Sequence, residues 1–279
     1  MSDPIVSTEW LAERLGRVTV IDASWFMPGS GRDPAADYAR VHIPGAVFFG
    51  IDEISDHTSD LPHMMSAPQD FATAVRRLGV RRCAEIVVYD SHGLFSAPRV
   101  WWNFRAMGHE ASFVLDGGLP RWIAEGRPVE SGWRTPEHGD FKARPDPALV
   151  ANLADMRRAI ETGEVQIVDA RAADRFAGAA PEPRAGLKSG HMPGARNAPW
   201  TGLVTDDGAL ADAPRVREVF EAAAVDLGRP IVTTCGSGVS ASILALALAR
   251  LGRPDVAVYD GSWSEWAACN DTPVGTGAA

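Results

Sequence analysis

Cys235 stands where a strand, a glycine-rich loop and a helix are expected to meet. The apolar run at 231–234 predicts a buried strand, and a helical pattern follows at 239–251. Between them, Gly236 and Gly238 permit tight curvature and positive φ angles, so successive N–H groups can converge on one point. The positive end of the helix faces that point too and favours a thiolate, which predicts a nucleophilic cysteine able to carry a charged adduct. The predicted cradle for the adduct comprises Gly236, Ser237, Gly238, Val239 and Ser240.

Other interpretations of this segment are weaker. Cysteine is among the most buried residue types, so Cys235 alone would be typical of core packing. A phosphatase loop requires an arginine six residues after the cysteine, and that position is Ala241. A Walker phosphate loop requires GxxxxGK followed by Ser or Thr, which this segment lacks. The order strand, cysteine, Gly-x-Gly loop and helix therefore favours a reactive thiol.

The chain repeats itself at a domain-sized interval. Three pairs of similar segments occur in the same order, at offsets of 147, 149 and 144 residues. They are VTVIDASW at 18–25 with VQIVDARA at 165–172, HIPGA at 42–46 with HMPGA at 191–195, and VLDGGLPRW at 114–122 with VYDGSWSEW at 258–266. Solenoid repeats are much shorter, at about 20–50 residues. The pattern predicts two copies of one domain.

Each copy alternates short β-branched runs with helical patterns. In the second copy, strands are expected at 165–169, 231–234 and 256–259, and helices at 213–225 and 239–251. This alternation is typical of a parallel sheet covered by helices on both faces. We therefore predict an α/β fold of two tandem domains, with the chemistry beyond the carboxyl ends of the strands.

The two copies differ at the position of the cysteine. At an offset of 145 residues, Asp90 takes the place of Cys235. A carboxylate cannot replace a thiolate as a sulfur nucleophile, so the first copy is expected to be non-catalytic. The stretch 131–146 is polar, contains Pro and Gly, and has no periodicity, as is typical of a linker. The predicted boundaries are 1–133 for the N-terminal domain, 134–150 for the linker and 151–279 for the C-terminal catalytic domain.

Composition and charge exclude several classes of function. Apolar residues make up 46% and charged residues 23%, as in an ordinary globular protein. The net charge of −9 argues against nucleic acid or an anionic membrane surface as the main partner. The longest uncharged run, 230–249, contains Thr, Gly and Ser, so it predicts strand, turn and helix rather than a membrane span.

Cysteine usage and the N-terminus bear on the compartment. Cys83, Cys235 and Cys269 cannot form a disulfide framework, and none lies in a CxxC pair. The first ten residues lack the basic and apolar regions of a signal peptide. A cytoplasmic, reducing location is therefore expected. The histidines include no HxH or HxxxH pair, so no metal is expected, and the chemistry calls for no organic cofactor.

The motifs together resemble those of two-domain sulfurtransferases of the rhodanese superfamily. HIPGA, HMPGA, PEPRAGLKSGHMPGA, CGSGVSA and YDGSWSEW carry the resemblance across both halves. It implies two tandem rhodanese-like domains. Thiosulfate sulfurtransferases of this family tend to have Arg and Lys after the cysteine, whereas Gly236 and Ser237 are similar to the CGSGV pattern of 3-mercaptopyruvate sulfurtransferases. A loop without cations also lacks counter-charges for the thiosulfate dianion.

The resemblance implies roles for residues outside the loop. The substrate-binding arginines of the family match Arg175 and Arg184, whose guanidinium groups can hold a carboxylate and polarise a keto oxygen. The family's Ser–His–Asp arrangement matches Ser237, His63 and Asp52. Taken alone, the last two would be interpreted as a loop histidine and a turn or helix cap. Because they lie in the first domain, the implied site is at the domain interface.

The implied reaction has two steps. Cys235 takes sulfur from 3-mercaptopyruvate, a small anionic donor, and releases pyruvate. A thiol, cyanide or a thioredoxin-like dithiol then removes the sulfur from the cysteine persulfide. The alternatives are a thiosulfate sulfurtransferase, and a non-enzymatic persulfide carrier or redox sensor that uses the same cysteine.

Overall fold

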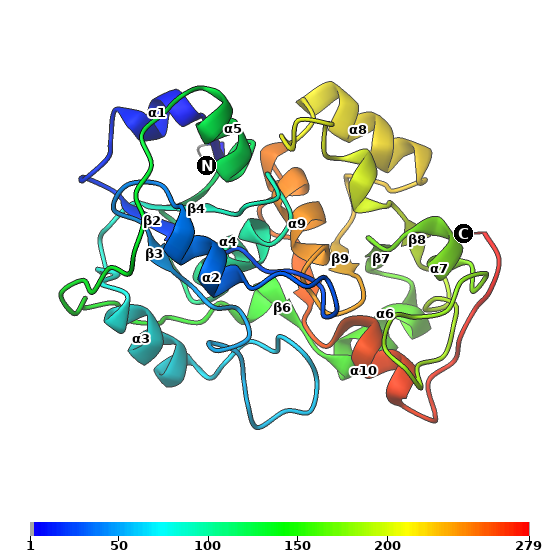
Figure 1. Cartoon of the computed structure of the whole chain (residues 1–279). Coiled ribbons are helices and arrows are strands. Elements are labelled where there is room, and N and C mark those ends of the chain that lie inside the picture. Colours follow the sequence, from blue (N-terminus) through cyan, green and yellow to red (C-terminus); the bar gives the residue numbers. More distant parts are fainter. Residues whose placement is uncertain (1–2, 279) are drawn as a thin grey trace.

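Two five-stranded parallel sheets organise the chain, which a computed structural model describes from residue 3 to residue 278. The strand order is β1-β5-β4-β2-β3 in the first sheet and β6-β10-β9-β7-β8 in the second. All the pairings between these strands are parallel. The second order is the first shifted by five strands, so the sheets share one topology (Figure 1). The prediction of an α/β fold in two copies is confirmed.

The elements of the first domain alternate regularly along the chain. Its strands are β1 (Ile5–Val6), β2 (Thr19–Asp22), β3 (Val47–Phe48), β4 (Ile86–Tyr89) and β5 (Ser112–Leu115). Its helices are α1 (Thr8–Ala12), α2 (Pro34–Arg40), α3 (Pro68–Arg77), α4 (Ala97–Ala106) and α5 (Gly118–Ala124).

The second domain repeats this alternation. Its strands are β6 (Val150–Ala151), β7 (Gln166–Asp169), β8 (Arg196–Asn197), β9 (Ile231–Thr234) and β10 (Ala257–Tyr259). Its helices are α6 (Leu153–Thr162), α7 (Ala173–Phe176), α8 (Ala213–Ala222), α9 (Ala241–Arg250) and α10 (Ser262–Ala268), with 3₁₀ turns η1 (Pro147–Leu149) and η2 (Trp200–Gly202).

Two helices of the second domain are shorter than the sequence predicts. The helix expected at 213–225 ends at Ala222, because Ala224 has a φ of 55°, outside the helical region. The helix expected at 239–251 begins only at Ala241. The residues before it curve around a point beyond β9, and this curvature forms the loop that follows the cysteine.

The connection between the sheets runs along the first domain. Residues 133–146 contain no helix or strand, and Phe141 is buried against Phe71 and Phe104 of the first domain. The first strand of the second sheet begins at Val150, the last residue of the predicted linker. The domain boundaries themselves stay a prediction.

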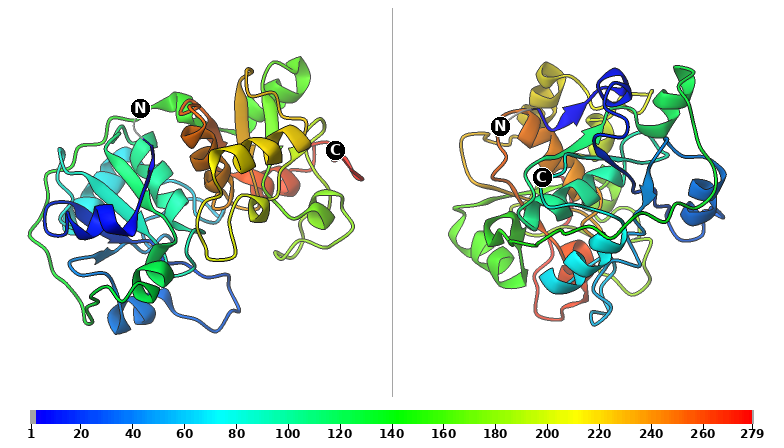
Figure 2. Two further views of the ribbon diagram at one scale, coloured as in Figure 1. Left: turned by 90° about the horizontal axis from the view of Figure 1, so that it is seen from above. Right: turned by 90° about the vertical axis from the view of Figure 1, so that its left-hand side faces the viewer.

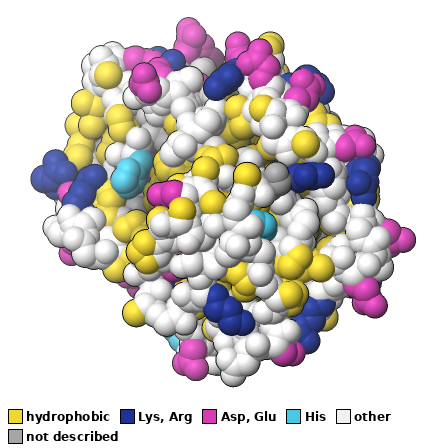
Figure 3. All heavy atoms as spheres, turned by 90° about the vertical axis from the view of Figure 1, so that its right-hand side faces the viewer, with side chains coloured by type: hydrophobic (Ala, Val, Ile, Leu, Met, Phe, Trp, Pro, Cys, Tyr) yellow, Lys and Arg dark blue, Asp and Glu magenta, His cyan; other side chains and the backbone are white. Residues whose placement is uncertain are grey.

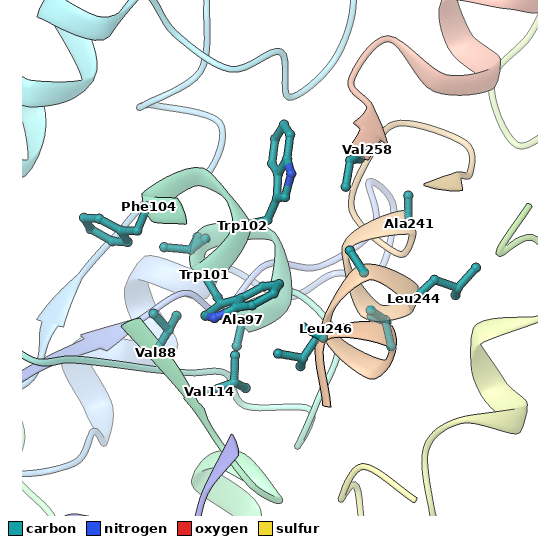
Figure 4. Packing of buried hydrophobic residues seen from close by; sticks show 14 of the residues in the cluster. Val88, Ala97, Trp101, Trp102, Phe104, Val114, Ala241, Leu244, Leu246 and Val258 are labelled. Atoms are coloured by element: carbon teal, nitrogen blue, oxygen red, sulfur yellow. The ribbon is translucent and has the colours of Figure 1, made fainter. Parts of the chain in front are cut away.

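Helices α4 and α9 meet where the two domains join. Figure 2 shows the two lobes, and Figure 4 shows α4 and α9 near each other, with the Trp101 ring of α4 extending toward Leu246 of α9. These side chains belong to one buried cluster that extends through both domains. Because α9 lies between its own sheet and α4, all of residues 241–249 are buried. This interface fixes the loop before α9 relative to the first domain.

The repeated histidine motifs have a structural role. His42 Nδ1 lies 2.8 Å from the carbonyl oxygen of Tyr38, and its ring stacks on the Tyr38 ring at 4.2 Å. His191 Nδ1 lies 2.9 Å from the carbonyl oxygen of Phe176, with the rings stacked at 3.9 Å. Each histidine thus holds the loop that leads into an edge strand of its sheet.

One buried carboxylate of the first domain lacks the counter-charge that its equivalent has. Asp169 ends β7, and its carboxylate accepts hydrogen bonds from the guanidinium of Arg171. Asp22 ends β2 at the equivalent position, but Ser24 replaces the arginine and its N–H donates to Asp22 Oδ1 at 2.9 Å. Burial therefore raises the pKa of Asp22 to about 6.

Asp22→Asn is expected to stabilise the protein at neutral pH. The raised pKa means that the protonated Asp22 side chain favours the folded state, and this contribution is lost as the pH rises through about 6. An amide stays neutral, so the variant should unfold with a free energy larger by up to about 3 kcal/mol near pH 7, and by much less near pH 4. Urea unfolding across this range measures the difference. Asp169→Asn is the matched control and should destabilise, because it breaks a buried ion pair; a gain from Asp22→Asn that does not vary with pH would contradict the prediction.

The outer face of the second domain carries both signs of charge. Lys and Arg side chains are interspersed with Asp and Glu on this face, without a continuous basic patch (Figure 3). In the part of the chain that the structure describes, none of the helices has the length and apolar character needed to cross a bilayer.

Candidate active site

The loop that carries Cys235 is fixed by the first residues of α10. Cys235 follows β9, and its side chain is buried. Its N–H donates to Ser262 Oγ at 3.2 Å, and its carbonyl accepts from the N–H of Trp263 at 2.9 Å. Ser264 donates to the carbonyl of Gly236 through both its N–H and its Oγ, at 3.0 and 2.7 Å. The cysteine is therefore held rigidly at the carboxyl end of a central strand.

The first domain shows what this kind of loop can bind. The carboxylate of Asp90, at the equivalent position, lies inside its own loop and accepts five backbone N–H groups. Oδ1 accepts from His92 and Gly93 at 2.9 and 3.1 Å. Oδ2 accepts from Phe95, Ser96 and Ala97, each at 2.8 Å. The loop of the first copy is thus a nest that already holds an anion of the chain itself.

A cavity of about 920 Å³ lies beside this Asp90 loop. Phe26, Phe95 and Trp200 contribute to its largely apolar walls, and no cysteine is among the described residues that line it. Residues of both domains line this cavity, so it lies where the domains meet, next to the loop that has Asp90 in place of a cysteine. The chemistry is better sought at Cys235, where charged groups gather.

Arg175 and Arg184 both reach the loop. A Cβ atom on Gly236 would lie 3.2 Å from Arg175 Nη2 and 4.0 Å from Arg184 Nη1. The structure therefore brings both predicted arginines to the residue next to Cys235. Glu182 holds Arg175 through an ion pair of 2.5 Å between Oε2 and Nη2.

Arg184 is the less neutralised of the two cations. Within residues 3–278, no carboxylate lies within ion-pair distance of its guanidinium. Burial lowers the pKa of Arg184, while negative charge at Cys235 opposes that shift. A half-buried guanidinium without a carboxylate beside a cysteine is suited to receive an anionic ligand.

His63 and Asp52 form a pair that the first domain contributes. His63 Nδ1 lies 2.7 Å from Asp52 Oδ1, and Trp25 Nε1 donates to Asp52 Oδ2 at 2.9 Å. The contact with His63 lowers the pKa of Asp52. Nε2, the other ring nitrogen, lies 3.3 Å from Arg184 Nη2, across the domain interface. A carboxylate beside Nδ1 and a guanidinium beside Nε2 favour the tautomer that carries the ring proton on Nδ1, with Nε2 as the acceptor.

The predicted Ser–His–Asp arrangement is formed only in part. The structure joins Asp52 to His63, but among the described residues no hydrogen bond links His63 to Ser237. Ser237 is buried in the same loop as Cys235. Sequence reasoning missed Trp25, which holds Asp52, and Glu182, which holds Arg175. Glu182 lies inside the PEPR motif, so its place between the two arginines was a signal that could have been used.

No group of three or more His, Cys, Asp or Glu side chains suited to a metal ion is found in residues 3–278. The groups that gather at the site are a thiol, two guanidinium groups, an imidazole and a carboxylate. They can bind a small carboxylate, stabilise a developing oxyanion and move a proton.

Comparison with known families agrees with this geometry. The model of the rhodanese-like domain matches residues 7–125 and 152–269, which are the two copies. The chain belongs to the rhodanese-like family. A rhodanese-like relative, the 3-mercaptopyruvate sulfurtransferase of Homo sapiens, is 44% identical over 270 residues, covering 94% of this chain and 91% of the relative. The bovine (Bos taurus) thiosulfate sulfurtransferase is also 44% identical, over 271 residues, covering 94% of this chain and 91% of the relative.

A rhodanese-like structure supports the same assignment. The crystal structure of SseA from Escherichia coli, described among 3-mercaptopyruvate sulfurtransferases, matches with a TM-score of 0.86 and 42% identity. The match covers 94% of this chain and 99% of that one. The two-domain rhodanese fold is therefore shared over nearly the full length.

Proposed function

We propose that this chain transfers sulfur from 3-mercaptopyruvate to a thiol or cyanide through a persulfide on Cys235, with release of pyruvate. The observation that carries the proposal is the pair of arginines beside Gly236. A Cβ atom added to this glycine would lie 3.2 Å from Arg175 Nη2 and 4.0 Å from Arg184 Nη1, while the cysteine loop has no cation of its own. This pattern suits a carboxylate-bearing donor better than thiosulfate. The relative from Homo sapiens carries the name of this activity.

The arginines orient the donor. We assign the carboxylate of 3-mercaptopyruvate to Arg184, whose guanidinium has no carboxylate partner among the described residues. Arg175, held in place by Glu182, faces the keto oxygen. Paired charge-assisted hydrogen bonds of this kind fix both position and direction. The thiol of the donor is then directed toward Cys235.

The first half-reaction breaks the carbon–sulfur bond of the donor. The thiolate of Cys235 attacks the donor sulfur, and the electron pair of the broken bond forms the enolate of pyruvate. The two guanidinium groups stabilise the negative charge on the enolate oxygen. His63, oriented by Asp52, accepts the proton from the sulfur and returns it to the enolate carbon. Ser237 is assigned the polarisation of the donor thiol.

The second half-reaction restores the cysteine. The outer sulfur of the persulfide is held by the N–H groups of residues 236–240, as the Asp90 loop holds its carboxylate. The nucleophile of the acceptor attacks that sulfur, and the thiolate of Cys235 leaves. We extend the proposal to a thioredoxin-like dithiol as acceptor, to a cytoplasmic location, and to residues 151–279 as the catalytic domain.

A comparison of two sulfur donors tests the proposal. With cyanide as the common acceptor, kcat/KM for 3-mercaptopyruvate is expected to exceed that for thiosulfate by at least about tenfold, because thiosulfate lacks the carboxylate that the arginines hold. Mass spectrometry of the intact protein should show one added sulfur atom after the donor alone, and its loss after cyanide. A higher value for thiosulfate would favour the thiosulfate sulfurtransferase, whose bovine representative is equally similar. A persulfide that no small acceptor removes would favour a carrier or redox sensor.

A further inference from the structure

Arg99 is a fully buried arginine that reaches from the first domain to the catalytic loop of the second. It lies on α4 with none of its surface exposed, and its guanidinium stacks over the Trp102 ring at 4.6 Å. Nη2 donates to Asp260 Oδ1 and to the carbonyl oxygen of His63, both at 2.5 Å. Burial of a cation costs free energy that pairing with a carboxylate only partly offsets, so its presence between the domains points to a role in fixing their geometry.

The bond from Arg99 bears directly on the orientation of His63. His63 has a φ of 61°, in the left-handed region that residues other than glycine rarely adopt. Such backbone conformations persist only where surrounding contacts hold them. Arg99 holds the carbonyl of this residue, and therefore fixes the direction in which the imidazole leaves the backbone.

The same guanidinium lies against the predicted cradle. A Cβ atom on Gly238 would stand only 2.6 Å from Arg99 Nη1, and Gly238 has a φ of 80°. Nε and Nη1 of Arg99 are buried and have no hydrogen-bond partner among the described residues. Arg99 therefore contacts the loop that carries the nucleophile as well as the residue that moves the proton.

Asp260 completes the connection between the two loops. Its Oδ2 accepts from the N–H of Met65 at 2.8 Å, two residues after His63. Ser262 and Trp263, which follow Asp260, hold the backbone of Cys235. The corner after β10 is thus bonded to the segment of His63 on one side and to the cysteine loop on the other.

No equivalent arginine of the second domain reaches the Asp90 loop of the first copy among the described residues. Asp116 occupies the place of Asp260 and accepts from the N–H of Leu210 at 3.0 Å, so the contact between domains is repeated. Its arginine, however, is Arg121 of the same domain, which is partly exposed, and the residue equivalent to Arg99 is Leu244. Of the buried arginines in residues 3–278, Arg171 pairs within its own domain, and Arg99, beside the proposed reacting groups, bridges the two domains.

We propose that Arg99 is a positioning residue, which acts through His63 by setting the imidazole of the first domain against the Cys235 loop of the second. This inference rests on the proposed function. Arg99 does not touch the donor. Its role is to join the proton carrier and the nucleophile, which come from different domains, into one site.

A double-mutant cycle between Arg99 and His63 tests this role. Arg99→Gln should lower kcat with 3-mercaptopyruvate at least about tenfold, with less than about a threefold change in KM, because binding to Arg175 and Arg184 is unchanged. Arg99→Lys keeps the positive charge and one donor nitrogen, so its kcat should lie between those of Arg99→Gln and wild type. In a His63→Ala background, Arg99→Gln should cost less than about twofold. Arg121→Gln, which cuts the equivalent corner of the first domain, should leave turnover unchanged.

The outcomes separate positioning from general destabilisation. Equal losses of kcat from Arg99→Gln with and without His63 would overturn the proposal, as would a loss seen in KM alone. If Arg99→Gln does not fold, the double-mutant cycle with His63→Ala is measured with Arg99→Lys and with Asp260→Asn instead. Nuclear magnetic resonance of the His63 ring nitrogens adds a readout independent of turnover: wild type should hold one tautomer, and Arg99→Gln a mixture. An unchanged tautomer would overturn the inference, whereas a wild type inactive with 3-mercaptopyruvate would overturn the proposed function alone.

Discussion

Replacing Cys235 by serine is expected to lower kcat for sulfur transfer at least about 1,000-fold, because a neutral hydroxyl is a poor nucleophile toward sulfur and cannot store it as a persulfide. The fold should be unaffected. Serine is slightly smaller than cysteine, and the hydrogen bonds of this loop run through its backbone to residues 262–264. Steady-state turnover, circular dichroism and the mass of the intact protein after exposure to the donor measure the three consequences.

The chain provides its own controls for this substitution. Cys83 is exposed and Cys269 is half-buried, and neither lies in the loop after β9. Cys83→Ser and Cys269→Ser should each retain turnover within about twofold of wild type and should still gain one sulfur atom. Turnover retained by Cys235→Ser, or an added sulfur on either of the other cysteines, would show that the nucleophile has been assigned wrongly.

The sequence predicts the fold well because the relevant signals are local. The order of strand, glycine-rich turn and helix around Cys235 is encoded within about twenty residues, and the structure has β9, the loop and α9 in that order. The duplication is also visible without structure, since the paired segments lie at nearly one offset. Helix ends are less well predicted. The start of α9 at Ala241 depends on how many residues form the loop between Cys235 and the helix, which periodicity does not report.

The site is predicted less completely because it is assembled across the domain interface. The contact between Arg184 and His63 joins residues 121 positions apart, and that between Arg99 and Asp260 joins residues 161 positions apart. No local spacing reveals such pairs, because they depend on how α4 packs against α9. The resemblance to a family supplied Asp52 and His63, but it could not show that His63 Nε2 faces Arg184. Arg99 has the sequence context of an ordinary helical residue, so only the structure reveals its position.

Asp90→Asn is expected to destabilise the first domain strongly, although it only replaces one carboxylate oxygen by an NH₂ group. The carboxylate accepts two N–H groups at Oδ1 and three at Oδ2. An amide replaces one of these oxygens by an NH₂ group, so at least two buried donors then face another donor. Each buried donor without an acceptor costs about 1–3 kcal/mol, so the free energy of unfolding should fall by at least about 2 kcal/mol. Urea unfolding at neutral pH measures this loss.

Asp116→Asn is the matched control, because the carboxylate of Asp116 accepts only one backbone N–H and is partly exposed. It should cost less than about 1.5 kcal/mol. Equal losses for the two variants would mean that the Asp90 loop does not depend on an anion. That result would also weaken the argument for the second domain, where the same loop geometry is proposed to hold a persulfide. The stability of the first domain therefore tests the anion-binding property on which the proposed chemistry of the second domain depends.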